Sequence, residues 1–246
     1  MEWVHKCSLS WLKRRQSCLT ASDIKQLVPY TATGRARKIT DETYLRVMAH
    51  KMVDLTEEDC ISHGAAARGH LLEPFAVDAL NTAQHHYETY YHWDDKIIIR
   101  GELGFSPDAM TIEQTDDIAK IMAEPKLGIA EIKCYSDEKH LVTAYTGKKS
   151  LEERWQIATA MAVLTNIDHA KLVLFNPRMK FRKLFVIDYN RYELQDEIDI
   201  INQIAADWYD FKISGFLSKK TVGWSSVGGS EESIAKRLEL NKTLNP

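Results

Sequence analysis

The segment at residues 127–134, L-G-I-A-E-I-K-C, narrows the possible folds of this 246-residue chain more than any other. It is apolar except for Glu131 and Lys133, and a short apolar run of this kind is typical of a buried β-strand. Alternation along a strand places both charged side chains on one face and Ile132 on the other. Two explanations are open: a salt bridge on a half-exposed strand, or a cleft in which both groups take part in chemistry.

The patterns around this strand predict an α/β fold, in which a central mixed β-sheet is flanked by helices. Apolar residues recur at three- and four-residue spacing in the outer parts of the chain, whereas the middle is rich in isoleucine, tyrosine and alternation. The expected helices cover residues 8–28 (interrupted at 19–23), 40–55, a short one from 56, 62–85, 151–165 and 192–213. The expected strands cover residues 87–93, 96–100, 109–112, 128–134, 171–175 and 183–188.

Local signals refine three of these elements. Ser22 is expected to cap a short helix that ends before Pro29, because a serine oxygen can accept from the first free N–H groups of a helix. Pro74 is expected to kink the helix over 62–85 or to mark a boundary within it. The acidic segment 113–127 is interpreted as a loop or an extended hairpin.

The two ends of the chain carry no membrane or export signal. No apolar run approaches the ~20 residues that span a bilayer, and residues 1–6 lack the apolar core of a secretory signal. Gly223, the glycine pair at 228–229 and several serines predict a flexible linker near the C-terminus. We therefore expect a single folded domain over residues 1–217 and a flexible tail over 218–246.

Cysteine spacing and charge limit the class of protein. No two cysteines form a C-x-x-C pair, so neither a zinc site nor a disulfide framework is indicated, and free thiols fit a reducing cytoplasm. The net charge of −3 argues against a protein coated in positive charge. Nucleic-acid binding depends on local clusters, however, and each basic cluster here is explained either by such a partner or by a solvated face. These clusters lie at residues 13–15, 35–38, 148–149 and 178–183.

A second acid lies near the charged strand. Asp108 follows a Ser-Pro turn at the head of the expected strand 109–112. If that strand pairs with 128–134, the side chains of Asp108, Glu131 and Lys133 converge, which suits metal-dependent hydrolysis of a phosphodiester. Two carboxylates bind a hard cation such as Mg²⁺, and a lysine beside them orients water and neutralises charge. These residue types are common, so the pattern by itself favours an ion pair at a sheet edge over a metal site.

Six blocks that occur in the same order resemble the lambda exonuclease family, also called the YqaJ-like viral recombinase nucleases. The resemblance implies the restriction-endonuclease-like core of the PD-(D/E)xK nucleases, a central mixed β-sheet flanked by helices. The blocks are W-L-K-R-R-Q-S-C-L-T-A-S (11–22), A-R-G-H-L-L-E-P (67–74), G-F-S-P-D-A-M (104–110), A-E-I-K-C (130–134), Gln156 and N-P-R-M-K (176–180).

The resemblance implies a catalytic role for five of these residues. Asp108 and Glu131 would bind the metal together with the backbone carbonyl of Ile132, and Lys133 would be the catalytic lysine. Glu73 would reach in from its helix to hold a second metal or a water bound to it, although first-turn charge at a helix restart is an alternative explanation. The gap between the two metal-binding carboxylates is longer than in the best-known member of the family. Other acids therefore stay open as partners, namely Asp116, Asp117 and Glu124.

The resemblance also implies a pocket for a 5′-phosphate, because a guanidinium and hydroxyl donors suit a phosphate better than an ammonium alone. The implied residues are Arg15, Ser22, Ser106 and Gln156. Lys13 or Arg14 could replace Arg15 as the phosphate contact. Helix capping explains Ser22 equally well, and Gln156 could be an ordinary exposed helix residue.

The implied activity is that of a Mg²⁺-dependent 5′→3′ exonuclease, with Mn²⁺ as a possible substitute. Such an enzyme degrades linear double-stranded DNA to 5′-mononucleotides and leaves 3′ overhangs for phage-type recombination by single-strand annealing. Its implied partners are DNA ends, two further copies in a ring-shaped homotrimer and an annealing protein, in the cytoplasm of a bacterial host. The alternatives are an endonuclease of the same fold, for restriction or repair, and a catalytically silent DNA-binding module.

Overall fold

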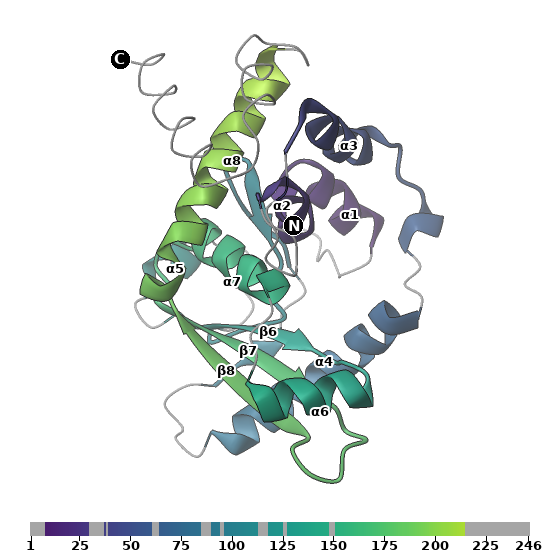
Figure 1. Ribbon diagram of the computed structural model, residues 1–246, viewed down its shortest axis with the longest axis vertical. Helices are drawn as coiled ribbons and strands as arrows, with labels where there is room; N and C mark the ends of the chain where they lie inside the picture. The colour runs from purple at the N-terminus through teal and green to yellow at the C-terminus, as the bar shows by residue number, and fades with distance from the viewer. Residues whose placement is uncertain are drawn as a thin grey trace.

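The computed structural model describes residues 8–29, 37, 39–60, 64–84, 90–93, 96–112, 118–124, 127–147 and 151–214 (Figure 1). Within these ranges the chain forms a five-stranded sheet in the order β2-β5-β6-β7-β8 and a three-stranded sheet in the order β1-β4-β3. In the larger sheet β6 and β7 are parallel and the other neighbours are antiparallel. The predicted α/β fold with a central mixed sheet is therefore confirmed.

The strands are β1 (Leu19–Thr20), β2 (His92–Trp93), β3 (Ile98–Arg100), β4 (Leu103–Phe105), β5 (Ala109–Met110), β6 (Ile129–Lys133), β7 (His169–Phe175) and β8 (Leu184–Asn190). The helices are α1 (Leu9–Gln16), α2 (Ala21–Leu27), α3 (Asp41–Met52), α4 (Gly64–Ala83), α5 (Ile118–Ala123), α6 (Asp137–Thr146), α7 (Leu151–Val163) and α8 (Gln195–Ser214). Two short 3₁₀ turns cover Glu57–Cys60 and Tyr192–Leu194.

The two faces of the larger sheet are buried against different helices. Strand β6 alternates, so that Ala130 and Ile132 belong to the core beneath α4, together with Val77 of that helix. Ile129 belongs to the larger core on the other face, to which α7 and α8 contribute. Figure 1 shows α7 and α8 above the strands and α4 below them. The strand is thus apolar on both faces except at Glu131 and Lys133, which share one face.

The central helix of the fold is α7. Apolar residues surround most of it, and it contacts α2, α8 and β4 as well as the larger sheet. A helix buried on most of its circumference is a core helix, which explains why its sequence carries few charges after the first turn. It ties the N-terminal helices to the sheet and places Gln156 above β6.

Two local predictions are wrong, and one of the two alternatives for Pro74, a helix boundary, is excluded. Thr20 and not Ser22 is the N-cap of α2, because the side chain of Asp23 accepts from the Thr20 backbone N–H at 2.7 Å. The interpretation of residues 113–127 as a loop or hairpin fails at α5, which buries Ile121 in the main core. Helix α4 runs through Pro74 from Gly64 to Ala83, so that proline marks no boundary.

Some predictions concern residues outside the described ranges. The tail at 218–246, most of the basic cluster at 35–38 and the lysine pair at 148–149 lie there, so the division of the chain at residue 217 stays a prediction. Among the helices that the structure describes, none is long and apolar enough to cross a lipid bilayer.

Candidate active site

The pairing of β5 with β6 brings together Asp108 and Glu131, the two carboxylates that the sequence assigns to the metal. Ala109 lies opposite Ala130, so Asp108 lies at the end of β5 beside Glu131. The backbone N–H of Ile132 donates to Asp108 Oδ2 at 2.7 Å, which fixes this carboxylate against β6. Both carboxylates are buried, with 7% of Asp108 and 5% of Glu131 exposed. The expected neighbourhood of the two strands is confirmed.

Glu131 and Lys133 share one face of β6, as the alternation predicts. Lys133 Nζ lies 2.6 Å from Glu131 Oε1, and Gln156 Nε2 donates to the same oxygen at 3.1 Å. Burial lowers the pKa of the Lys133 ammonium, but the carboxylates of Glu131 and Asp108 raise it by more, so the net shift is upward. The salt bridge therefore exists, although it lies inside the protein and not on a half-exposed strand.

Glu73 reaches the same region from α4. It is 7% exposed, its Oε1 lies 3.2 Å from His70 Nδ1, and its Oε2 accepts from Trp93 Nε1 at 3.4 Å. The sequence patterns did not predict that His70 and Trp93 contact Glu73. His70 lies one helical turn before Glu73, which was a usable signal, but the contact with Trp93 depends on β2 lying beside α4.

The two serines come together through a short parallel pairing. Leu19 and Thr20 of β1 lie opposite Leu103 and Gly104 of β4. The two strands are parallel, so the chain leaves both of them at the same edge of the small sheet. Ser22 and Ser106 each follow the last paired residue of their strand by two positions, and they therefore lie on the same side of this sheet. Ser106, Pro107 and Asp108 then carry the chain from the smaller sheet to the larger one, so the acids lie at the junction of the two sheets.

A cleft of about 340 Å³ lies at this junction. Its walls come from α1, α2, α4, β6, α7 and the turn after β4. All nine residues that the sequence assigns to catalysis or phosphate binding line it, namely Arg15, Ser22, Glu73, Ser106, Asp108, Glu131, Ile132, Lys133 and Gln156. The residues come from distant parts of the chain, and the fold brings them to one place.

Within the described part of the chain, Trp11 Nε1 and two oxygens of the cleft residues are buried without a hydrogen-bond partner. Ser106 Oγ and Gln156 Oε1 are buried, and neither has a hydrogen bond within the part of the chain that the structure describes. A buried polar atom without a partner costs free energy, which a bound ligand with polar groups can recover. Both atoms therefore suit a polar ligand.

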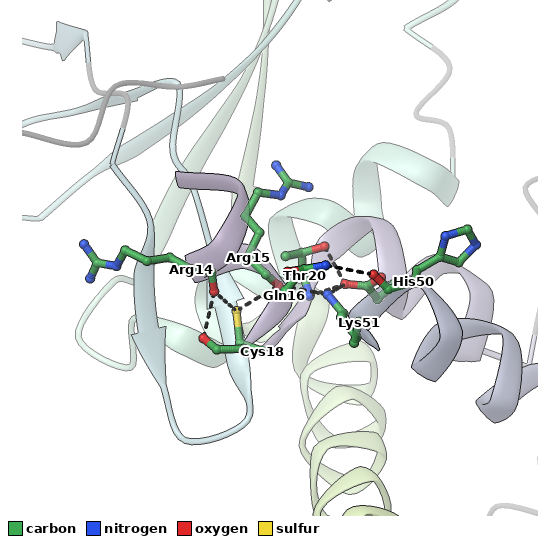
Figure 2. Close-up of polar contacts among 9 residues, drawn as sticks. Arg14, Arg15, Gln16, Cys18, Thr20, His50 and Lys51 are labelled. Atoms are coloured by element: carbon green, nitrogen blue, oxygen red, sulfur yellow. Dashed lines mark hydrogen bonds and ion pairs between the residues drawn. The ribbon is translucent and has the colours of Figure 1, made fainter. Parts of the chain in front are cut away.

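Helix α1 presents three cations, of which one lines the cleft. Arg15 lines the cleft, whereas Lys13 and Arg14 do not. Arg14 and Arg15 leave the helix in different directions (Figure 2). The Arg15 guanidinium lies over the Trp11 ring, 4.4 Å from its centroid, and Trp11 also lines the cleft. Of the three alternatives, the geometry favours Arg15 as the cation that a ligand in the cleft would meet.

A lysine whose side chain is 10% exposed holds the wall that carries Arg15 and Ser22. Lys51 of α3 donates to the backbone carbonyl of Arg15 at 2.9 Å and to Asp23 Oδ2 at 2.6 Å. It thereby joins the end of α1 to the start of α2, while Gln16 of α1 donates in return to backbone carbonyls at the end of α3 (Figure 2). These contacts fix α1 and α2 relative to one another.

The acids do not form a larger cluster. Within the described ranges, no three side chains of His, Cys, Asp or Glu come together as a metal-binding group. Asp108 contacts β6 through the backbone N–H of Ile132, Glu131 belongs to β6, and Glu73 lines the same cleft from α4. Of the alternative acids, Asp116 and Asp117 lie outside the described residues, and Glu124 does not line the cleft.

Comparison with known proteins identifies related sequences and folds. The profile of the YqaJ-like viral recombinase domain matches residues 10–168. The fold is similar to that of an alkaline exonuclease, LHK-Exo, from Laribacter hongkongensis, with a TM-score of 0.57 and 19% identity over 84% of this chain and 97% of that one. A second structure, LHK-Exo in complex with dAMP, gives a TM-score of 0.55 and 21% identity over 86% and 100%. No curated protein matches the sequence significantly.

Proposed function

Since the chain belongs to the family of the YqaJ-like viral recombinase domain, we propose that it is a metal-dependent exonuclease. It degrades linear double-stranded DNA from the 5′ end, releases 5′-mononucleotides and leaves 3′ overhangs. The observation that carries this proposal is the convergence of Asp108, Glu131 and Lys133 with the candidate phosphate-binding residues in one cleft.

The cleft fits a hard divalent cation. Asp108 and Glu131 offer buried carboxylate oxygens, and the backbone carbonyl of Ile132 would add a third oxygen. Mg²⁺ commonly binds through one or two carboxylates together with waters and substrate phosphates, so two carboxylates without a third suffice, and Mn²⁺ would substitute. Glu73 would hold a second cation. When bound, the cation would neutralise phosphate charge and make a water more acidic.

Lys133 would act on the attacking water and on the phosphate. Its raised pKa keeps the side chain an ammonium at neutral pH, a form that donates hydrogen bonds and carries positive charge. The contact with Glu131 holds the ammonium in the cleft. Lys133 would therefore orient the water and offset the charge that develops on the phosphate oxygens.

The 5′-terminal phosphate would lie between α1, α2 and the turn after β4. Arg15 supplies a planar guanidinium, which suits bidentate contact with a phosphate, and Ser22 supplies a hydroxyl. Ser106 Oγ and Gln156 Oε1 would contact the terminal nucleotide, and the absence of hydrogen bonds to these two oxygens in the described part of the chain supports this role. LHK-Exo, whose fold is similar, has been solved with a nucleoside monophosphate, dAMP.

We also propose the larger setting of the reaction. The enzyme would work as a ring-shaped homotrimer that encircles DNA, and it would hand its 3′ overhang to a single-strand annealing protein in the cytoplasm of a bacterial host. Membership of a viral recombinase family supports an annealing partner. Sedimentation of the purified protein would give the mass of its oligomer, and a mass other than three chains would exclude the trimer.

Digestion of defined DNA tests the proposed activity. Linear duplexes with a 5′-phosphate or a 5′-hydroxyl are incubated with the protein and Mg²⁺, or with a chelator. We expect mononucleotides to be released only with Mg²⁺, and faster from the phosphorylated end. Cutting of closed circular DNA would instead identify an endonuclease, and binding without any cleavage would identify a silent DNA-binding module.

A further inference from the structure

The connection between β7 and β8 displays an aromatic ring among basic side chains. This β7–β8 loop covers residues 176–183, and Phe181 within it is 83% exposed. Arg178, Lys180 and Lys183 are also exposed. Among the large hydrophobic side chains that the structure describes, only Tyr192 is more exposed than Phe181, and an exposed phenylalanine between cations is an arrangement found where proteins bind nucleic acid.

The β7–β8 loop is held rigidly in place. At its start the backbone N–H of Asn176 donates to the carbonyl of Lys183 at 2.8 Å, and the Asn176 side chain donates to Asp137 Oδ1 at 2.9 Å. Near its tip the Arg182 guanidinium donates to the Ala144 carbonyl at 2.9 Å. These contacts tie both ends of the loop to one another and to α6, so the exposure of Phe181 is a fixed feature of the fold.

The backbone at the tip is strained. Arg182 has a φ of 53°, a left-handed conformation that side chains other than glycine rarely adopt, and no other non-glycine residue in the described ranges has a positive φ. The Arg182 carbonyl contacts His140 Nε2 at 2.7 Å, and its guanidinium lies over the Tyr145 ring at 4.4 Å. Strain that the surroundings maintain points to a function for the neighbouring side chain, Phe181.

The loop lies at the catalytic edge of the sheet. Strands β6 and β7 are parallel and Lys133 lies opposite Leu174, so the chain enters the loop two residues beyond the level of Lys133. Figure 1 shows the connection from β7 to β8 directly below α6, the helix that follows β6. Lys139 of α6 adds a further cation, over the Tyr135 ring at 3.7 Å. The surface that carries Phe181 therefore lies at the Lys133 end of the sheet, where Lys139, Lys180 and Lys183 supply cations and Arg178 pairs with Asp137 at 3.2 Å.

We propose that the β7–β8 loop binds single-stranded DNA, with an unpaired base stacked on Phe181 and phosphates beside Lys180 and Lys183. An exposed ring can stack on an unpaired base, whereas the bases of a duplex are already stacked on one another, so the ring favours single strands. The lysines would neutralise phosphates of the same strand. The inference rests on the proposed function for the source of the strand, because a 5′→3′ exonuclease leaves a single strand beside its cleft.

Binding of the full chain to a fluorescent oligothymidine, measured by anisotropy with chelator present, tests the proposal. Loss of one stacked base weakens binding by about fivefold or more, so Phe181→Ala should reduce the affinity by at least that factor. Tyr192→Ala is the matched control, because Tyr192 is 92% exposed but follows β8 at the opposite end of that strand. It should bind as the wild type does. Equal affinities of the two variants would overturn the proposal.

Salt dependence and a duplex probe complete the test. Each lost contact with a phosphate of a single strand lowers the slope of log affinity against log salt by about 0.7. Replacing Lys180 and Lys183 by alanine together should therefore lower it by about 1.4. If Phe181→Ala weakens binding of a blunt duplex as much as that of the oligothymidine, the surface is not specific for single strands and the proposal fails. A wild-type protein that binds the oligothymidine through Phe181 but releases no nucleotides would refute the exonuclease alone.

Discussion

Replacing Lys51 by methionine tests whether one buried ion pair holds the wall of the cleft. The side chains of Lys51 and Asp23 are 10% and 11% exposed and their charged atoms lie 2.6 Å apart. Removing one partner of a buried pair costs about 3–5 kcal/mol, because the other charge is left without compensation. Asp23 retains two hydrogen bonds from Thr20, each of 2.7 Å, so we expect a loss near the lower end of that range, about 3 kcal/mol.

Equilibrium unfolding in urea measures this loss, and Lys171→Met is the matched control. Lys171 and Asp188 form an ion pair of the same length, 2.6 Å, but Asp188 is 71% exposed. Water screens such a pair, so its loss should cost less than about 1 kcal/mol. For a domain of this size the difference between the variants corresponds to roughly 4–8 °C in melting temperature. Similar losses of stability in Lys51→Met and Lys171→Met would refute the reasoning from burial.

Two further predictions concern the pairing of β1 with β4. Gly104→Ala should destabilise the fold by about 1–3 kcal/mol, because the new Cβ would lie 2.2 Å from Cys18 Sγ. This loss of stability should be smaller in a Cys18→Ala background, where the nearest remaining atoms lie 3.4 Å from the new Cβ. A double-mutant cycle of urea unfolding measures that coupling, and additive losses would exclude the clash. Burial raises the pKa of the Cys18 thiol from 9.0 to about 11. As the pH rises, this thiol therefore ionises in the unfolded chain before it ionises in the folded one. The stability that the neutral buried thiol contributes is complete below pH 9 and should be lost as the pH rises from 9 to 11. Unfolding measured across this range should show a shallower fall in Cys18→Ala than in the wild type, and equal slopes would contradict the assignment.

The parts of the site that sequence could predict depend on local spacing. Two-residue periodicity places Glu131 and Lys133 on one face of a strand, wherever that strand lies in the fold. The Ser-Pro-Asp turn marks the head of β5 in the same way. The resemblance to a known family then supplied Arg15 and Gln156, which no local pattern identifies, and all of these residues line one cleft.

The parts that sequence could not predict depend on contacts between distant segments. Strand β1 is two residues long, too short for any periodicity, and it exists because it pairs with β4 more than 80 positions away. The contact between Lys51 and Asp23 joins different helices, and nothing in the spacing of the two residues indicates it. Helix α5 has only six residues, and it forms where the packing of Ile121 outweighs the polar composition around it.

One helix was missed although its signals are present. Helix α6 follows Ser136 as its N-cap, carries Asp137 and Glu138 in its first turn, and ends at Gly147, whose φ of 60° suits a left-handed C-cap. These are the ordinary start and stop signals of a helix.

The role of Lys133 is tested most directly by measuring nucleotide release and DNA binding together in Lys133→Met. Lys171→Met, which changes a lysine on the neighbouring strand β7, is the control, because Lys171 does not line the cleft. If Lys133 acts on the water and the phosphate, Lys133→Met should lose at least 100-fold in rate, on the order of one acid–base or electrostatic contribution. Its affinity for DNA should stay close to that of the wild type, and Lys171→Met should keep both properties. Near-normal nucleotide release by Lys133→Met would contradict the assignment of this cleft as the active site.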